Sequence, residues 1–379
     1  MPRFLHAPLP PDGLRHGLLW AVSLGLSLLF TAGIVVEWHG AGRHDVADTV
    51  VGTVVTRERE VDPVVAQYFP DGHPVVRIPT GVMLNSIEFV NAYNVKVAGY
   101  LWQRRIPGLP DDVGHGVIFP EAEEQRAAAK PTTVFKVFNY TIESYAFNVT
   151  LRQTFDYRNY PLDHQDVWLR MRSADVQNPI QLVPDFLGYP AWRPGRLQGL
   201  DPSFVLGDWQ PDYTAFSMLH RDSGLSANIA GFRGADLYFN LGVDRNLAGP
   251  LIGRIVPVLL LALLLFLSLF VITTDPDRRT ISGFTAFAII GFAVSTVLVV
   301  AVNDNAARTE TGSTGIAYIE CWYFALYLLT LLVALNATLL ITGGLRRLVG
   351  WRENLLPKLL FWPLFTGVMY VAALGFLGH

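Results

Sequence analysis

The stretch RNYPLDHQDVWLRM, residues 158–171, sets a turn directly against a strand. Pro161 favours the turn, because proline fixes its own φ angle and has no amide hydrogen to donate to a sheet. After the turn, apolar and polar side chains alternate from Val167 to Met171. A period of two residues is typical of a half-buried strand. Asp163 lies between the two elements, where its carboxylate needs a partner if the turn is buried.

The same alternation recurs through residues 81–246. It is cleanest in SYAFNVTLRQTFDY, residues 144–157. One face of that segment carries Tyr145, Phe147, Val149 and Leu151. Short runs of this kind, separated by clusters of Gly, Pro, Asn and Asp, predict an antiparallel β-sandwich. Residues 40–80 form an extension to which the pattern assigns no structure.

The chain changes character in residues 247–379. Only 16% of all residues are charged, against about 25% in an average soluble domain, and the shortfall lies mostly here. Four apolar runs occupy residues 251–274, 280–302, 316–341 and 355–378. Each is near or above the roughly 20 residues that a helix needs to cross a bilayer. Four such runs in a row predict a transmembrane four-helix bundle rather than helices buried in a soluble core.

Basic residues indicate the orientation of this bundle. Arg278 and Arg279 lie in the link between the first two runs, and four further basic residues precede or open the fourth. The positive-inside rule puts both regions in the cytoplasm. We therefore expect a multi-pass protein of the inner (plasma) membrane, with its sandwich on the periplasmic or extracellular side.

A fifth apolar run, residues 18–36, lies within the N-terminal segment 1–39. It is longer than the roughly 7–15-residue core of a signal peptide and offers no clear cleavage site, which favours an uncleaved anchor over a signal peptide. Either alternative exports the sandwich. The predicted fold is thus an N-terminal anchor or signal helix, an extension, an antiparallel β-sandwich and a four-helix transmembrane bundle.

Several classes of function are disfavoured. The single cysteine, Cys321, rules out an intrachain disulfide and a cysteine-based zinc site. A net charge of −3 gives no basic footprint for nucleic acid. The sequence shows no glycine-rich phosphate loop, nucleophile elbow or clustered metal ligands. We expect no enzyme activity, cofactor or metal.

The segment YPLDHQ resembles the Cys-loop of pentameric ligand-gated ion channels, which is a Pro-loop in their prokaryotic members. Their aromatic-Pro-apolar-Asp-x-Gln pattern matches residues 160–165. YLWQRR (100–105) and VLGDWQPD (205–212) resemble the two tryptophan-bearing strands of that family. FNLGVDRNLAGPLIGRIVPVLLL (239–261) resembles its last strand and first helix, with Arg245 before the helix.

The resemblance covers roughly residues 80–378 and has three departures. Both loop cysteines are missing, as in the prokaryotic branch. Arg104 stands where the family has an aspartate, and the loop after the second helix is longer and lacks a proline.

The resemblance implies that Tyr160, Pro161, Asp163 and Arg245 couple the sandwich to the bundle. A carboxylate–guanidinium pair between Asp163 and Arg245 would hold the loop against the entry to the first helix. The alternative is that both side chains are solvated surface charges, which contribute little to stability.

The second apolar run is the expected pore helix. With Arg278 as the basic residue at its start, the pore-lining face carries Thr280, Phe284, Phe287, Gly291 and Val294. Asp277 would then form a ring of carboxylates that favours cations, and Phe284 or Phe287 an apolar constriction. With Arg279 in that role, the face shifts to Ile281, Thr285, Ala288 and Phe292.

Aromatic side chains are the expected ligand-binding residues, because they can surround a cationic ligand. Tyr140, Trp192 and Phe232 lie in suitable loops, although ordinary loop packing also accounts for each. The resemblance implies a homopentamer in membrane lipid, each chain having four identical partners. A small-molecule or proton agonist would open its pore to inorganic ions. The alternative is a non-conducting membrane sensor or adaptor that keeps the channel scaffold.

Overall fold

The computed structural model describes residues 11–42, 49–69, 75–108, 113–124, 131–137, 139–189, 197–221, 234–271, 279–312, 315–342, 351–352 and 354–378. The chain forms two compact units. The sheet unit comprises His44–Asp156 and Asp163–Asn246. The helical unit comprises Met1–Arg43, Tyr157–Leu162 and Leu247–His379.

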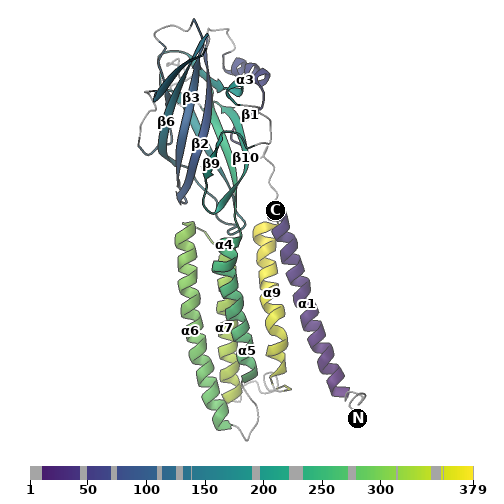
Figure 1. Ribbon diagram of the computed structural model, residues 1–379. Coiled ribbons are helices and arrows are strands. Elements are labelled where there is room, and N and C mark those ends of the chain that lie inside the picture. Colours follow the sequence, from purple (N-terminus) through teal and green to yellow (C-terminus); the bar gives the residue numbers. More distant parts are fainter. Residues whose placement is uncertain are drawn as a thin grey trace, which may run out of the picture. The chain divides into compact units, whose positions relative to one another are not determined.

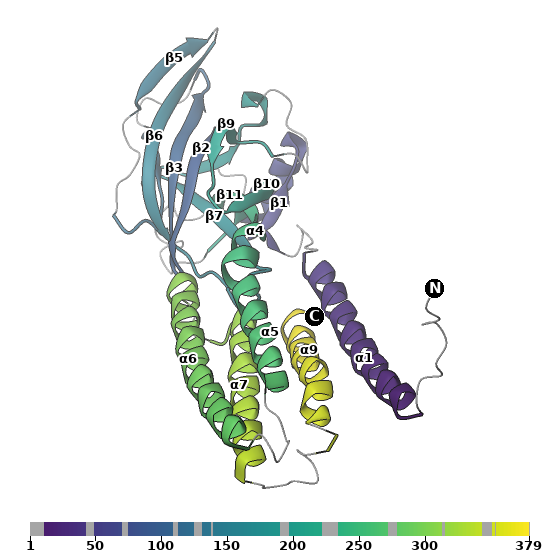
Figure 2. The same ribbon diagram turned by 60° about the horizontal axis from the view of Figure 1, so that its bottom comes forward.

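The sheet unit contains two β-sheets (Figures 1 and 2). The five-stranded sheet has the order β1 (Thr53–Val55), β10 (Trp209–Leu219), β11 (Asp236–Arg245), β7 (His164–Ser173), β4 (Val117–Ile118). The six-stranded sheet has the order β5 (Thr133–Val137), β6 (Tyr140–Arg152), β3 (Asn94–Arg105), β2 (Val76–Asn91), β8 (Ile180–Pro184), with β9 (Leu200–Val205) also on β2.

Most of the strand pairs are antiparallel, as expected, but the second sheet is mixed. β8 and β9 both pair with β2 in parallel, whereas β3 pairs with it antiparallel. A parallel pair cannot be closed by a hairpin, so the chain reaches β8 and β9 through longer connections. The alternation in a single strand does not reveal the direction of its neighbour.

One hydrophobic core lies between the inner faces of the two sheets. The alternation predicted for residues 144–157 is confirmed in β6, where the four apolar side chains are buried. They are Tyr145, Phe147, Val149 and Leu151. In β7 the apolar positions Val167, Leu169 and Met171 are buried as well. These strands read correctly from the sequence because each has one buried face.

Part of residues 40–80, the extension to which the sequence pattern assigns no structure, contributes to the same core. β1 adds to the five-stranded sheet through β10. A short 3₁₀ helix (Glu58–Glu60) leads into α3 (Val61–Tyr68), whose buried residues Val61, Val64 and Val65 join the core. The strand expected from residue 81 begins at Val76.

Within the described residues, the helical unit contains five helices that are long and apolar enough to cross a membrane. They are α1 (Pro11–Ala41), α5 (Val256–Val271) with the turns that precede it, α6 (Arg279–Thr311), α7 (Tyr318–Thr342) and α9 (Leu355–Leu377). The turns before α5 are α4 (Ala248–Pro250) and a π-helical turn (Leu251–Ile255). Five such helices indicate a multi-pass membrane protein.

The N-terminal helix α1 packs lengthwise on α9. The Ser23 hydroxyl donates to the Leu359 carbonyl at 2.6 Å, and the rings of Phe30 and Tyr370 lie 5.8 Å apart. A Cβ added at Gly33 would lie 2.4 Å from the Tyr370 ring, so glycine lets the two helices approach closely. Neither an anchor nor a signal peptide requires this packing.

Candidate functional site

A buried ion pair joins the residue before β7 to the last residue of β11. The Asp163 carboxylate accepts two hydrogen bonds from the Arg245 guanidinium, at 2.7 Å (Nε to Oδ1) and 3.0 Å (Nη2 to Oδ2). Only 1% of the Asp163 side chain and 8% of the Arg245 side chain are exposed. The structure therefore brings the two residues together in the bidentate geometry that arginine offers a carboxylate.

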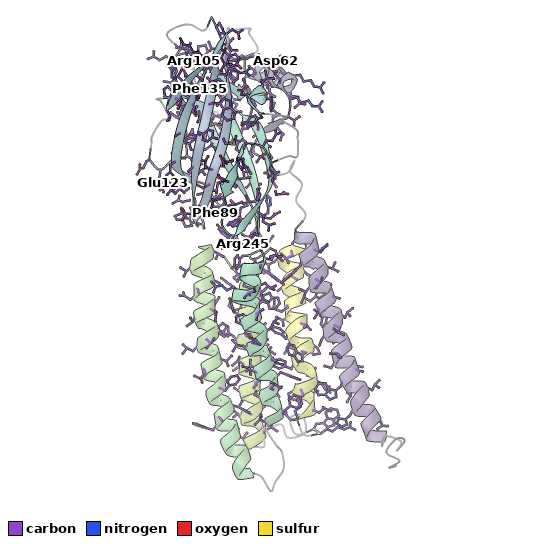
Figure 3. All side chains as sticks on the ribbon, viewed as in Figure 1. Asp62, Phe89, Arg105, Glu123, Phe135 and Arg245 are labelled. Atoms are coloured by element: carbon purple, nitrogen blue, oxygen red, sulfur yellow. The ribbon has the colours of Figure 1, made fainter. Side chains whose placement is uncertain are left out.

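Neighbouring side chains fix this pair in place. The guanidinium of Arg245 lies 4.1 Å from the ring centroid of Trp209, a favourable position for a cation over an indole. The Trp209 ring lies 4.6 Å from that of Phe89, which belongs to the other sheet (Figure 3). The Gln165 side-chain amide donates to the Asp163 carboxylate at 3.2 Å. The pair is thus part of the packed end of the sheet unit.

The turn ahead of Asp163 belongs to the helical unit, and it caps α7. The carbonyl of Arg158 accepts a hydrogen bond from the Tyr318 amide at 2.7 Å, and that of Tyr160 accepts one from the Ile319 amide at 3.1 Å. The first amides of a helix have no partners within it, so these carbonyls satisfy two of them. Tyr160 is buried, and its peptide bond to Pro161 is cis. The chain passes between the two units at the peptide bond from this turn to Asp163.

His164 follows Asp163 and is held by two carboxylates. Its Nδ1 lies 2.7 Å from Asp244 Oδ1 and its Nε2 lies 3.1 Å from Asp166 Oδ1, with 4% of the side chain exposed. Burial by itself would lower the pKa of His164, but the hydrogen bonds to Asp166 and Asp244 outweigh it and raise the pKa to about 9. His164 is therefore a charged imidazolium at neutral pH.

A bulge in β10 brings a third carboxylate to His164. The register shifts between Pro211 and Tyr213, which places Asp212 near Asp244. The ligand atoms of His164, Asp212 and Asp244 lie within 4.8 Å of one another. The sequence does not reveal this cluster, since its members come from three strands. A divalent cation would have to displace the proton on His164 Nδ1, so the arrangement favours a charged cluster over a metal centre.

The departure at Arg104 is matched by a partner of opposite charge. Arg104 forms an ion pair with Asp185, which also accepts a hydrogen bond from Trp102 Nε1 at 2.9 Å. The Asp185 side chain is 2% exposed. Tyr140 also lies here, with the Arg104 guanidinium 5.6 Å from its ring centroid. Of the three aromatic residues expected to bind a ligand, Trp192 and Phe232 lie outside the described residues.

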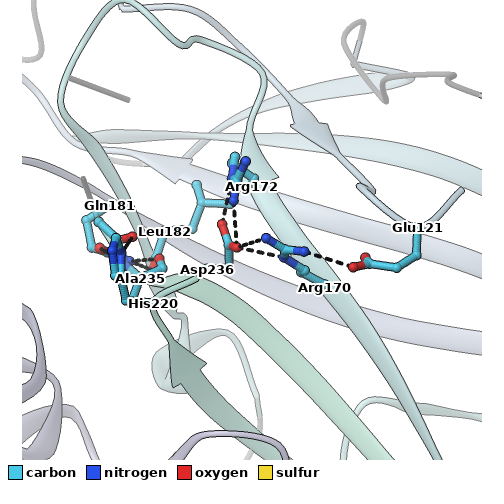
Figure 4. Close-up of polar contacts among 9 residues, drawn as sticks. Glu121, Arg170, Arg172, Gln181, Leu182, His220, Ala235 and Asp236 are labelled. Atoms are coloured by element: carbon cyan, nitrogen blue, oxygen red, sulfur yellow. Dashed lines mark hydrogen bonds and ion pairs between the residues drawn. The ribbon is translucent and has the colours of Figure 1, made fainter. Parts of the chain in front are cut away.

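A polar network lies at the start of β11 (Figure 4). Asp236 accepts hydrogen bonds from the guanidinium groups of Arg170, at 2.6 Å, and Arg172, at 2.7 Å. Arg170 also donates to Glu121 at 2.9 Å. Asp236 and Arg170 are buried, so each charge needs these partners. The alternation of β7 put both arginines on one face but could not predict their acidic partner.

The exposed face of α6 carries the described residues of the first pore register. Phe287 is 77% and Val294 67% exposed, and Gly291 is exposed between them. The opposite face, at the same spacing of three to four residues, is buried. It consists of Ala286, Ile289, Ala293, Thr296 and Val300.

The second register finds less support in the burial of its side chains. Ala288 is exposed but Phe292 is half-buried. The side chains of Thr280, Phe284, Ile281 and Thr285 and the whole of Asp277 lie outside the described residues. The helix also continues to Thr311, beyond the expected end at residue 302. In this added part, Arg308 donates to the buried Glu320 of α7 at 2.8 Å.

No protein-family model matches the chain, and no curated protein matches it.

We expect Asp163→Asn to lower the free energy of unfolding of the sheet unit by about 3–5 kcal/mol, because it leaves the buried Arg245 without a charged partner. The matched control is Asp62→Asn, which breaks the exposed Arg77–Asp62 pair and should cost about 0–1 kcal/mol. Urea unfolding of the full-length protein in detergent, followed by tryptophan fluorescence, measures both. Equal effects would show that the Asp163 pair is no stronger than a surface pair.

The His164 cluster predicts a loss of stability at alkaline pH. Because the folded pKa is raised to about 9 from an ordinary value of 6.5, the stabilisation is complete below pH 6.5 and disappears as the pH rises through 9. It amounts to on the order of 3 kcal/mol. The melting temperature of the wild type should fall over this range, and that of His164→Gln should start lower and change less. His115→Gln, at a half-exposed histidine, is the control that keeps the wild-type profile. Parallel profiles for His164→Gln and wild type would contradict the assignment.

Proposed function

We propose that the protein is a homopentameric ligand-gated ion channel, with an outer β-sandwich as its sensor and a transmembrane helix bundle as its pore. The observation that carries this proposal is the position of the turn at residues 157–162. The turn gives two carbonyls to the start of α7, and the next residue, Asp163, binds Arg245. Two residues after Arg245, the chain enters the helical unit.

This arrangement supports mechanical coupling between strands and helices. The chain crosses between the units at 162–163 and at 246–247, and the Asp163–Arg245 pair ties together the strand ends beside these crossings. Its two members are rigidly placed, because arginine binds the carboxylate bidentately and stacks on Trp209. A shift of β7 against β11 would therefore be passed to the segments that continue into the helices. Tyr160, Pro161, Asp163 and Arg245 are the coupling residues of this proposal.

The pore is assigned to α6. Its buried face packs within the chain, and its other face carries Phe287, Gly291 and Val294. In a ring of five copies these faces would surround the axis, with the Phe287 side chains as a constriction that gates by dewetting. Asp277 at the start of the helix would add a ring of carboxylates, which favours cations. By their helical spacing in the sequence, Thr280 and Phe284 would continue this face toward Asp277.

The stimulus would act on the sheet unit from the periplasmic or extracellular side. An amine suits the aromatic residues Tyr140, Trp192 and Phe232 through cation–π contacts. A proton agonist would have to act on groups other than His164, since that imidazolium is already charged at neutral pH. Phe232 precedes Asp236, at the start of β11, by four residues, so agonist contact at Phe232 would be transmitted along β11.

The first test is the assembly mass of the full-length protein in mild detergent, by native mass spectrometry. Five chains of 42.1 kDa are expected. A monomer or dimer that persists in lipid nanodiscs would remove the axis that a pore requires, and would favour a non-conducting sensor or adaptor instead.

Thiol labelling tests the pore face without knowledge of the agonist. In a Cys321→Ser background, which removes the single native cysteine, Val294→Cys should react with a charged, water-soluble thiol reagent. Leu331→Cys on α7 is the matched control, because Leu331 is 65% and Val294 67% exposed in the single chain. Leu331→Cys should stay unlabelled, since a thiol in lipid remains protonated and inaccessible. Equal protection of both cysteines would place this face of α6 in lipid and contradict the pore assignment.

A further inference from the structure

A long apolar cavity of about 490 Å³ lies within the helical unit, between α1, α9 and the N-terminal part of the first bundle helix. Its lining runs along α1 from Trp20 to Trp38 and includes Ile255, Leu259 and Phe365 on the facing helices. An engineered cavity of about 150 Å³ is sufficient to bind benzene. The present cavity has room for a considerably longer apolar guest.

Apart from the indole N–H groups of its tryptophans, the described lining offers a guest almost nothing but hydrocarbon. Each hydroxyl of the described lining donates to a backbone carbonyl, at 2.6 to 2.9 Å. These hydroxyls belong to Ser23, Ser27, Thr31 and Thr366. Their hydrogen atoms are therefore not available to a polar ligand. A guest must gain its binding energy from dispersion and from removal of apolar surface from other surroundings.

The shape of the cavity selects an extended chain. The 18 residue steps from Trp20 to Trp38 span about 27 Å at the 1.5 Å rise of a helix. A helix about 10 Å across would need roughly 2,100 Å³ over that length, which is more than the cavity offers, so an extended hydrocarbon chain fits better than a helix of another protein. Leu24, Leu28 and Val35 border the cavity and are 59–62% exposed, so the cavity is accessible from the side that faces lipid.

Two cationic side chains lie near one end of the cavity. Trp20 stacks on Phe270 with 6.4 Å between ring centroids, and the Lys358 ammonium lies 4.8 Å from the centroid of that same Phe270 ring. Arg15 precedes Trp20 by little more than one turn of α1, on an exposed position. Cations at the end of a spanning helix attract anionic lipid headgroups. Tryptophans are found at both ends, as expected where a site reaches the two polar boundaries of the bilayer.

We propose that this cavity binds an acyl chain of an anionic membrane phospholipid, whose phosphate group lies at the end of α1 and α9 that carries Arg15 and Lys358. The lipid fills the space between α1 and the bundle and so completes their packing. This binding does not depend on channel activity, and it would remain if the protein conducted no ions.

The test uses the full-length protein, stripped of lipid in detergent and titrated with phosphatidylglycerol. Native mass spectrometry counts the bound lipids. A phosphatidylglycerol with brominated acyl chains should quench tryptophan fluorescence, because four of the nine tryptophans line the cavity. Diacylglycerol, which has the chains but no phosphate, should bind at least tenfold more weakly than phosphatidylglycerol. Equal binding of the two lipids would overturn the assignment of the charged end.

Two neighbouring leucines provide a matched pair of variants. Leu28 borders the cavity and is 61% exposed, whereas Leu29 is 66% exposed and is not among the lining residues. Leu28→Trp places an indole in the space and should weaken phosphatidylglycerol binding at least tenfold, while Leu29→Trp should leave it unchanged. Lys358→Gln should reduce the preference for phosphatidylglycerol over diacylglycerol without loss of chain binding. If Leu28→Trp and Leu29→Trp bind equally, or if the wild type retains no lipid and shows no quenching, the proposal is wrong.

Discussion

The buried pair between Asp163 and Arg245 is the interaction on which the other features of the candidate site depend. A guanidinium and a carboxylate with exposures of 8% and 1% are stable only while both are present. That requirement fixes the end of β11 against the start of β7. The Arg245 guanidinium also lies over the Trp209 ring, and Asp163 directly follows the turn whose carbonyls cap α7. The position of His164, one residue later, follows from the same anchor.

The parts of the fold that the sequence predicts correctly have either a regular alternation of apolar and polar residues or a long apolar run. Tyr145 to Leu151 alternate because one face of β6 is buried, and the spanning helices are evident because lipid tolerates only long apolar runs. The segment 49–69 was not assigned because β1 has three residues and α3 eight, which is too short for a clear period. The sequence does not predict the end of α6 correctly, because residues 303–311 are mostly polar and a loss of apolar character is typical of a helix end in a membrane protein.

The candidate site also has residues that the sequence predicts and residues that only the structure reveals. The pairing of Asp163 with Arg245 is implied by the family resemblance, whereas periodicity alone favours two solvated surface charges. The partners of Arg104, Arg170 and Arg308 could not be predicted, since Asp185, Asp236 and Glu320 reach them only through tertiary packing. Asp212 depends on a β-bulge, and a bulge of one residue leaves no periodic trace in the sequence. Ion-pair partners are therefore the contacts that the sequence predicts least well.

The packing of α1 on α9 has a consequence for biosynthesis. α1 ends at Ala41, and α9 does not begin until Leu355, so the first spanning helix emerges from the ribosome long before the helix on which it packs. During that interval Gly33 has no Tyr370 ring beside it, and Ser23 has no carbonyl of Leu359 to bind. Contacts between such distant segments form late, because the chain between them must first be ordered. The insertion machinery or the bilayer itself must therefore hold α1 as a separate helix until translation reaches α9.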